Sequence, residues 1–425
     1  MALLSLELSN LSLSHDILNT KLSDSGFELK WLLNCLLEPD TNFDKLDLDF
    51  NNIVKVTTTD IGAGKGHLSR VYLVTLFFST DEQLDLVVKV PTIAILNAIR
   101  AHTGQEMYQE DSSGAQLVYE SHNRECEFYE MVRNQNPSKT HTPKAYFIKK
   151  VGPIPTEDRG VLVLESLAKS SLSVGLFESA TKEMVLSLAK CLADLHATCL
   201  NLEGQPWKEL ENTPLQTDYL AMSVTPRYLP ALQHKCPDVY NEFLPLKKMV
   251  NPEFLKYCII DRAVEMNAIG FVYGDCYGNN TLFKKNPDGS IGNELAGFVD
   301  LQLVGWGNGL FDLARFITIC VDAEIRRQYA EEAFVTYYNH LSSQVKQPVP
   351  QTLEQARELF DLATIHQAIY YVFLIPASML GNARGVSPEV LEARMAKLQL
   401  RGRMAFRDAV KLLQKYDLKR FENKE

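Results

Sequence analysis

The stretch at residues 271–283, FVYGDCYGNNTLF, places an aspartate after an apolar run and an asparagine five residues later. A turn capped by Asp275 is one interpretation, because glycine and asparagine are common in turns. The other is a loop that holds a hydroxyl group, a metal ion and phosphates together. In this second interpretation Asp275 accepts the proton of an attacking hydroxyl, and the side-chain oxygen of Asn280 binds Mg²⁺.

A further carboxylate follows in AGFVDLQLVGW, where Asp300 ends an apolar strand pattern twenty residues beyond Asn280. A short hairpin would bring the two residues opposite each other and complete a Mg²⁺ site made of oxygen ligands only. The alternative is a strand-terminal aspartate that begins a turn.

Upstream, the run DIGAGKGHLSRVY contains Gly62, Gly64 and Gly66 between two strand patterns. Glycines at such positions allow backbone N–H groups to approach phosphates. The run lacks the spacing of a Walker A loop, and it does not open a helix as a dinucleotide-binding fingerprint would. A simple glycine hairpin remains the alternative.

A lysine, Lys89, lies among apolar residues in the next strand pattern, LVVKVP. A half-buried lysine needs a partner. Glu125, on a helix that follows, could supply it, and such a pair would hold the lysine against the α- and β-phosphates of ATP. The alternative is a solvated lysine on an edge strand.

The hydrophobic periodicity along the whole chain predicts an α+β fold. Residues 1–50 are expected to be a helical N-terminal extension. Residues 51–167 are expected to form an antiparallel sheet of about five strands with a helix after the third. Residues 168–425 are expected to be mostly helical, including one helix that ends at Gly270.

Composition narrows the class of protein. The 425 residues carry a net charge of -10 with a pI of about 5.5, which argues against a nucleic-acid-binding surface. Eight scattered cysteines without a CxxC pair favour reduced thiols in a cytoplasmic protein. We expect no signal peptide, because the N-terminus lacks a basic region, and no membrane-spanning segment, because no run reaches the roughly 18 apolar residues needed. The sequence makes no prediction of the oligomeric state.

The order of these features forms a single pattern: glycine-rich hairpin, strand lysine, helix glutamate, Asp-x4-Asn, then aspartate. Phosphoryl transfer requires positioned phosphates, a metal ion that neutralises charge, and an oriented nucleophile. The sequence therefore predicts an ATP- and Mg²⁺-dependent phosphotransferase.

Two motifs also resemble a known group of proteins. YGDCYGNN and VDLQ are similar to the catalytic loop and metal motif of the aminoglycoside phosphotransferase and choline kinase branch of the protein-kinase-like superfold. HNRECEFYEMV, GVLVLESL, LADLHA and GLFDLARF are most similar to the ecdysteroid-kinase-like (CHK kinase-like) family. The resemblance covers about residues 55–400. It implies a bilobal fold with a small antiparallel-sheet lobe and a larger helical lobe.

The resemblance also implies roles for individual residues. Asp275 would be the catalytic base, Asn280 and Asp300 the Mg²⁺ ligands, and Lys89 a phosphate ligand paired with Glu125. Residues Glu165 to Leu167 would form a hinge that presents backbone groups to adenine, and Asp312 would brace the loop or act as a helix N-cap. Tyr273 stands where the family usually has histidine. Glu127 is the alternative partner of Lys89.

The acceptor is expected to be a small hydroxylated molecule. Only twelve positions separate Asp300 from Asp312, which leaves no room for the activation segment of a protein kinase. The resemblance implies a sterol, a glucoside or an amino alcohol, and the alternative is a nucleotide-binding pseudokinase or scaffold without turnover. Four acidic residues could attract a cationic acceptor or form a solvated helix face: Asp322, Glu324, Glu331 and Glu332.

Overall fold

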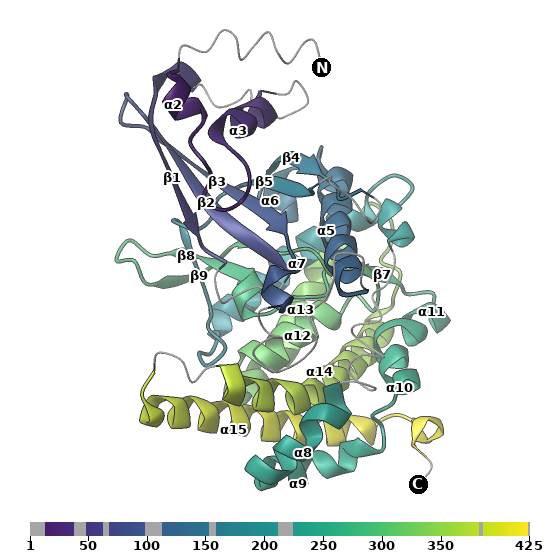
Figure 1. Ribbon diagram of the computed structural model, residues 1–425. Coiled ribbons are helices and arrows are strands. Elements are labelled where there is room, and N and C mark those ends of the chain that lie inside the picture. Colours follow the sequence, from purple (N-terminus) through teal and green to yellow (C-terminus); the bar gives the residue numbers. More distant parts are fainter. Residues whose placement is uncertain are drawn as a thin grey trace. The chain divides into compact units, whose positions relative to one another are not determined.

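The computed structural model describes residues 13–37, 48–62, 68–97, 113–152, 159–210, 224–381 and 386–423. The chain divides into two compact units (Figure 1). The first contains Met1–Pro137 and Thr142–Ser170, and the second contains Ser138–His141 and Ser171–Glu425. The division after Ser170 lies close to the boundary expected at residue 167.

The first unit is built on a five-stranded sheet with the order β1-β2-β3-β5-β4. All four neighbouring pairs are antiparallel. The strands are β1 (Ile53–Asp60), β2 (Ser69–Phe78), β3 (Gln83–Pro91), β4 (Ala145–Lys149) and β5 (Val161–Glu165), and the helix α5 (Ser113–Val132) follows β3. The predicted sheet and its inserted helix are confirmed.

The N-terminal helices share the hydrophobic core of this sheet. They are α2 (His15–Leu18) and α3 (Leu29–Leu36), followed by a 3₁₀ turn at Phe50–Asn52. Leu32 and Leu33 of α3 are fully buried and pack in the same cluster as Val74 and Val88 of the sheet. Residues 13–37 and 48–50 therefore contribute to the core of the first unit, because their apolar face needs the sheet to cover it.

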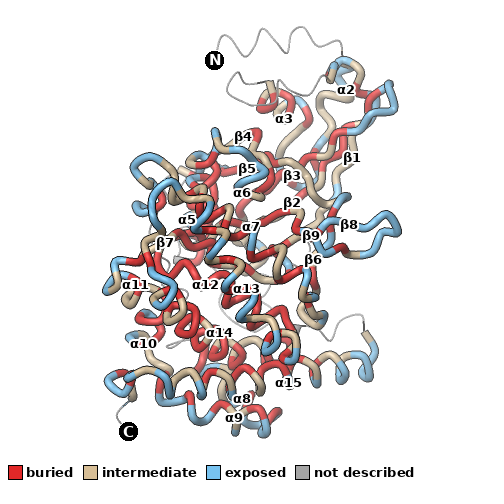
Figure 2. Tube along the Cα trace, turned by 180° about the vertical axis from the view of Figure 1, so that it is seen from behind, coloured by how far each residue is buried: buried red, intermediate tan, exposed pale blue. Residues whose placement is uncertain are grey.

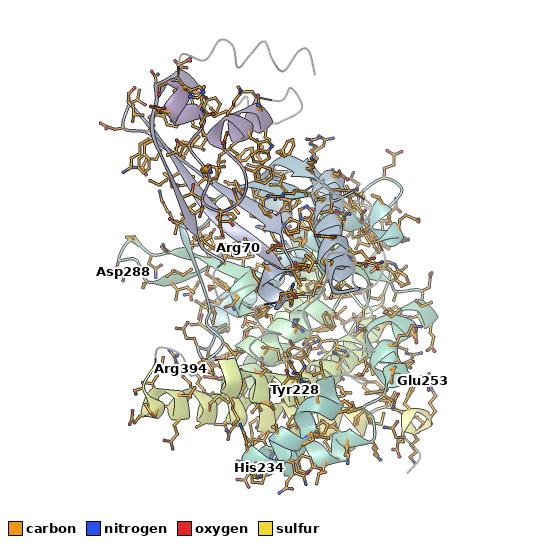
Figure 3. The ribbon with its side chains drawn as sticks, in the orientation of Figure 1. Arg70, Tyr228, His234, Glu253, Asp288 and Arg394 are labelled. Carbon is orange, nitrogen blue, oxygen red and sulfur yellow. The ribbon has the colours of Figure 1, made fainter. Side chains whose placement is uncertain are left out.

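A polar contact joins the same segment to β2 of the sheet. Asp24 accepts a hydrogen bond of 2.8 Å from the Tyr72 hydroxyl and also pairs with Arg70, which Figure 3 labels. Burial and the hydrogen bond to Asp24 raise the pKa of Tyr72 to about 12. The tyrosine therefore stays a donor across the physiological pH range.

The second unit is mostly helical, as predicted. Its longer helices are α7 (Lys182–Leu200), α8 (Thr225–Lys235), α9 (Pro237–Lys247), α12 (Phe311–Cys320), α13 (Ala323–Gln344), α14 (Leu353–Gly381) and α15 (Pro388–Leu413). Shorter helices are α6 (Pro137–Thr140), α10 (Pro252–Lys256) and α11 (Arg262–Glu265), with 3₁₀ turns at Pro206–Glu209, Gly278–Asn280 and Lys419–Phe421. All ten residues of α12 are buried, and Figure 2 colours α12 and α14 largely as buried.

Two small sheets accompany these helices. One has the order β6-β8-β9 and the other pairs β10 with β7. Their strands are β6 (Ser171–Ser173), β7 (Gly270–Val272), β8 (Thr281–Lys285), β9 (Ile291–Phe298) and β10 (Gly305–Gly307). The motif at residues 271–283 thus leaves one sheet, β7, and enters the other, β8. The predicted α+β fold, with an antiparallel sheet region followed by a larger helical region, is confirmed.

The predicted helix end at Gly270 is wrong. The helix α10 continues through a π-helical turn at Tyr257–Asp261 into α11 and stops at Glu265. Asn267 then takes a positive φ of 52°, and the N–H of Ala268 bonds back to the carbonyl of Ala263. Asparagine therefore terminates this helix, and Gly270 begins β7.

The prediction that no segment is apolar enough to span a membrane is also wrong for one helix. By length and composition, Leu353–Met379 of α14 meets that criterion. Within it, 78% of the most apolar window is buried inside the protein, as in the core helix of a globular unit. All eight cysteines are free and seven of them are buried, which agrees with the expected reduced core thiols.

Candidate functional site

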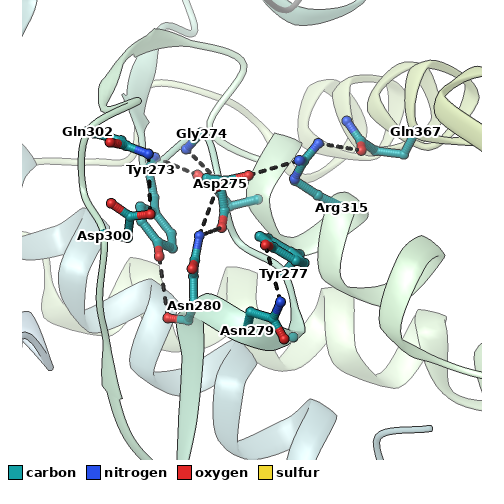
Figure 4. Close-up of polar contacts among 12 residues, drawn as sticks. Tyr273, Gly274, Asp275, Tyr277, Asn279, Asn280, Asp300, Gln302, Arg315 and Gln367 are labelled. Carbon is teal, nitrogen blue, oxygen red and sulfur yellow. Dashed lines mark hydrogen bonds and ion pairs between the residues drawn. The ribbon is translucent and has the colours of Figure 1, made fainter. Parts of the chain in front are cut away.

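The central loop folds the Asp-x4-Asn motif back on itself. The Nδ2 of Asn280 donates to Oδ2 of Asp275 over 2.8 Å and to its backbone carbonyl over 3.2 Å (Figure 4). A 3₁₀ turn at Gly278–Asn280 produces this return. The two residues that the sequence singled out are therefore in direct contact.

The loop begins at a glycine that no other residue could replace without strain. Gly274 has a φ of 87°, and a Cβ there would lie 2.3 Å from the backbone oxygen of Leu303. Both the positive φ and the close approach require glycine. Gly274 thus sets the path of the chain immediately before Asp275.

Asp312 holds the start of this loop. Its two carboxylate oxygens accept hydrogen bonds of 2.8 Å from the backbone N–H groups of Tyr273 and Gly274. Asp312 is fully buried in the first turn of α12, and Nε2 of His196 lies 3.5 Å from its Oδ2. The residue at the N-cap of α12 is Leu310, so the alternative of Asp312 as an N-cap is wrong.

Tyr273 connects the loop to the β8–β9 hairpin. Its hydroxyl donates to the carbonyl of Val299, and its ring packs against Phe298 at a centroid distance of 5.6 Å. Burial raises the pKa of Tyr273 well above its usual value. A buried, permanently neutral tyrosine therefore stands at the position where histidine was expected.

The hairpin register brings Asp300 close to Asn280. Thr281 pairs with Phe298, and the N–H of Val299 donates to the carbonyl of Asn280 over 3.0 Å. The strand β9 ends at Phe298, two residues earlier than expected, and Asp300 has a positive φ of 62°. Non-glycine residues rarely adopt this conformation, and where they do they often serve a function.

Arg315 is the residue that sequence reasoning missed. Its Nη2 donates to Oδ1 of Asp275 over 2.8 Å, and the two side chains are only 11% and 15% exposed. Its Nη1 donates to Gln367 of α14 over 3.2 Å. The signal was present in GLFDLARF, because residues three apart on a helix lie on one face and Asp312 was already assigned to this loop.

The electrostatics of the loop are dominated by carboxylates. Burial raises the pKa of Asp275, the Arg315 guanidinium opposes this rise, and the negative charge of Asp300 adds to it. Asp312 contributes a third carboxylate on the other side of the loop. A group of this composition favours a cation.

The donor set suits Mg²⁺ in particular. Because Asn280 donates its amide N–H to Asp275, its Oδ1 is the atom left to act as a ligand, and Asp300 adds carboxylate oxygen. Magnesium is usually held by one or two such protein groups, with phosphates and water completing the octahedron. In the part of the chain that the structure describes, no cluster of three or more His, Cys, Asp or Glu residues forms a metal site.

The first unit holds the other predicted pair. Nζ of Lys89 lies 2.5 Å from Oε2 of Glu125, and the two side chains are 7% and 1% exposed. β3 is flanked by β2 and β5, so the alternative of a solvated edge-strand lysine is wrong. Glu127 instead lies 3.5 Å from Lys150 and is about half exposed. The structure thus selects Glu125.

The remaining predicted residues of the first unit are only partly placed. Gly62 follows β1, and its N–H donates to Asp60 over 2.9 Å. Gly64 and Gly66 lie outside the described residues. Glu165 ends β5, and its carboxylate accepts a hydrogen bond of 3.2 Å from the backbone of Lys144, while Leu167 follows two residues later.

The four acidic residues near α13 do not form a free patch. Asp322 pairs with Lys397 and Arg401, at 3.0 and 2.7 Å. Glu331 pairs with Arg357, and Glu332 lies 3.0 Å from Lys182. Three of the four therefore link α13 to other helices, which differs from both earlier interpretations.

Two curated proteins of Caenorhabditis elegans are similar in sequence. "Uncharacterized oxidoreductase dhs-27" is 24% identical over 341 residues, which cover 77% of this chain and 40% of that protein. "Uncharacterized kinase-like protein D1044.1" is 21% identical over 344 residues, covering 72% of this chain and 78% of that protein. The chain thus spans less than half the length of the first relative.

Two solved structures are similar in fold. Choline kinase from Cryptosporidium parvum has a TM-score of 0.44 at 11% identity and covers 88% of this chain and 92% of its own. An aminoglycoside phosphotransferase in complex with GDP and kanamycin has a TM-score of 0.41 at 14% identity, covering 82% and 95%. Both names fall in the branch that the motifs resemble.

The narrower resemblance to the ecdysteroid-kinase-like family stays a prediction. The family model described as "Uncharacterized oxidoreductase dhs-27" matches residues 50–405, which include every described element from β1 to most of α15. The chain therefore belongs to this family, DUF1679.

Proposed function

We propose that this protein is an ATP- and Mg²⁺-dependent phosphotransferase that acts on the hydroxyl group of a small molecule. The observation that carries the proposal is the contact of Asp275 with Asn280 in a loop braced by Asp312, with Asp300 nearby in the hairpin. Catalysis of phosphoryl transfer consists mainly of such positioning and charge stabilisation.

The first unit would supply the groups that hold the nucleotide. Lys89, fixed by Glu125, would bind phosphate oxygens, and the turn with Gly62, Gly64 and Gly66 would let the phosphates approach the backbone. Backbone groups from Glu165 to Leu167 would contact adenine. The buried ion pair supports this role, because a lysine ammonium held in one place by a carboxylate is ready to bind a phosphate.

The second unit would supply the metal ligands and the base. Asn280 and Asp300 would hold Mg²⁺, which when bound neutralises charge on the phosphates. Asp275 would take the proton of the acceptor hydroxyl as it attacks the γ-phosphorus. Its carboxylate accepts from Asn280 on one oxygen and from Arg315 on the other. These contacts hold the carboxylate in one orientation, which lowers the entropic cost of reaching the reactive geometry.

Aromatic side chains beside the base favour an acceptor with a ring-shaped apolar body. The Arg315 guanidinium lies 4.9 Å from the Tyr370 ring and 5.9 Å from the Tyr277 ring. Phe373 contacts both Tyr370 and Tyr228, and all four aromatic side chains are partly exposed. A sterol or glucoside would pack on such side chains better than a small amino alcohol.

Oxidoreductase activity, which the name of one relative includes, has less support in this chain. A doubly wound dinucleotide-binding fold requires a parallel sheet with a glycine-rich turn from strand to helix. Among the described residues every strand pair is antiparallel, and Gly62 lies between two antiparallel strands. Cytoplasmic location and the absence of nucleic-acid and membrane partners remain predictions.

The test begins with calorimetric titration of ATP, with and without Mg²⁺, into the wild type, Asp300→Asn and Asp275→Asn. We expect binding that requires Mg²⁺ and weakens about tenfold or more in Asp300→Asn. ADP release is then measured with a panel of ring-bearing alcohols. Asp275→Asn should still bind ATP but lose about 10²- to 10⁴-fold in turnover, the usual contribution of general base catalysis.

The matched control is Glu324→Gln, which removes an exposed carboxylate of the same unit and should change neither quantity. Mg²⁺-dependent ATP binding without turnover on any alcohol would favour the pseudokinase alternative. Absence of ATP binding under both conditions would contradict the proposal.

A further inference from the structure

Both carboxylate oxygens of Asp275 are already engaged by protein donors. Oδ1 accepts from the Arg315 guanidinium and Oδ2 from the Asn280 amide, each over 2.8 Å (Figure 4). The amide of Asn280 is turned by this contact so that its nitrogen, not its oxygen, faces Asp275. Asp275 and Asn280 therefore touch through the nitrogen of the Asn280 amide, not through the oxygen that suits a metal ion.

Arg315 is held in place from three directions. It belongs to α12, whose ten residues are all buried. Its Nη1 donates to Gln367 of α14, and its guanidinium packs on the rings of Tyr370 and Tyr277. A planar guanidinium fixed in this way keeps its donors aimed at one carboxylate oxygen, which a flexible lysine would not do.

Without Arg315, Asp275 would be an available ligand for a divalent cation. Asp300 follows Val299, whose N–H donates to the carbonyl of Asn280, and the side chain of Asn280 contacts Asp275, so the two carboxylates lie near each other. Divalent cations with oxygen ligands readily recruit an additional carboxylate. A carboxylate bound to a metal cation is less basic, so it accepts a proton less readily.

We infer that Arg315 is a positioning residue that keeps Asp275 out of the coordination sphere of the metal ion and so reserves it for the acceptor hydroxyl. The inference rests on the metal site in the proposed function. The Asp-x4-Asn motif alone does not keep the base from binding the metal ion, and we assign this role to the Arg315 guanidinium.

The test measures Mn²⁺ affinity by electron paramagnetic resonance, because Mn²⁺ accepts the same oxygen ligands as Mg²⁺ and its free form gives a direct signal. Arg315→Met removes the charge and the donors while retaining an apolar side chain of similar length. We expect this variant to bind Mn²⁺ about tenfold or more tightly than the wild type, because Asp275 becomes a ligand. Arg315→Lys, which retains the charge but not the rigid planar donors, should tighten Mn²⁺ binding less than Arg315→Met does.

Removal of a positive charge alone would also tighten cation binding, so the comparison is repeated in the Asp275→Asn background. There the effect of Arg315→Met should be at least about tenfold smaller, since no carboxylate is released. Arg327→Met is the matched charge control: Arg327 is 44% exposed on α13 and pairs with Asp408 outside this loop. It should leave the affinity unchanged.

Equal tightening in both backgrounds would mean that Arg315 acts only through its charge, and this result would overturn the inference while leaving the metal site intact. Unchanged affinity in Arg315→Met would overturn it as well. Failure of the wild type and all variants to bind Mn²⁺ would remove the metal site and the inference together. If Arg315→Met does not fold, Arg315→Gln replaces it with the same expected direction.

Discussion

The two regions that carry the candidate chemistry balance their charges differently. In the first unit, Lys89 and Glu125 form a buried pair of one cation and one carboxylate. In the second unit, Asp275 and Asp312 take part in the hydrogen bonds of one loop, Asp300 lies nearby, and Arg315 pairs with Asp275. The sheet region pairs opposite charges directly, whereas the carboxylates of the loop accept largely from backbone and amide N–H groups.

This difference indicates what each region does. A matched buried pair is costly to break, because the partner left behind keeps its charge without compensation. A group of carboxylates held by backbone N–H groups and amides is tolerated when a cation completes it. The first region therefore fixes the position of Lys89, and the second region is suited to bind a cation. Four measurements test the comparison, from the largest expected effect to the smallest.

Removal of one partner of the Lys89–Glu125 pair should destabilise the first unit. Glu125→Ala should lower the free energy of unfolding of the first unit by about 3–5 kcal/mol, because Lys89 is left charged in the core. The double variant Lys89→Met/Glu125→Leu should lie within about 1 kcal/mol of the wild type, since an apolar pair needs no compensation. Urea unfolding monitored by circular dichroism measures both.

The control is Glu127→Ala, which removes an exposed carboxylate two residues away on α5 and should cost less than about 0.5 kcal/mol. A double variant as unstable as Glu125→Ala would show that the region is not held by charge balance.

A neighbouring histidine should make the first unit sensitive to acid. His122 of α5 donates from Nε2 to the carbonyl of Lys149 over 2.9 Å, and burial, assisted by the charge of Lys89, lowers its pKa from 6.5 to about 4. Between these values the unfolded chain binds a proton and the folded chain does not. The free energy of unfolding should therefore fall by about 3 kcal/mol as the pH decreases from 6.5 to 4, and should be unaffected by His122 above 6.5.

Urea titrations at several pH values in the wild type and His122→Gln measure this dependence, which the variant should lack. His234→Gln, at an exposed position on α8, should retain it. Identical pH dependence in the wild type and His122→Gln would contradict the assignment.

The backbone at Tyr273 and Gly274 should become more mobile when Asp312 loses one hydrogen-bond acceptor. Asp312→Asn leaves a single side-chain oxygen for the two N–H groups of Tyr273 and Gly274. An unpaired buried donor costs about 1–3 kcal/mol. Hydrogen exchange of these two amides, read by mass spectrometry, should accelerate in the variant, while Glu324→Gln leaves it unchanged. Unaltered exchange would mean that the loop is held by other contacts.

The smallest effect is expected at Tyr273. Tyr273→Phe removes only the hydroxyl that donates to the carbonyl of Val299 and leaves the ring against Phe298. We expect a loss of about 0.5–1.5 kcal/mol in the free energy of unfolding of the second unit. A loss of more than about 3 kcal/mol would place Tyr273 among the main supports of the loop rather than its minor ones.

Short-range features were predictable because their signals lie within a few residues of one another. The alternation of apolar residues predicted all five strands of the first sheet and the helix after the third. The five-residue spacing predicted that Asp275 and Asn280 share one loop, and a 3₁₀ turn brings them into a contact that the spacing did not predict. The end of the helix before β7 was missed because Asn267, rather than Gly270, adopts the positive φ that ends it.

By itself, the sequence determined which segments form strands and helices, that Lys89 needs a partner, and that an aspartate and an asparagine meet in one loop. Only the tertiary structure selected Glu125 over Glu127, brought Arg315 to Asp275 across forty residues, and set Asp312 as a brace instead of a cap. The physical reason is that periodicity and turn chemistry depend on neighbours in the chain. The partner of a buried charge depends on which helices pack together, and that is decided by the whole core.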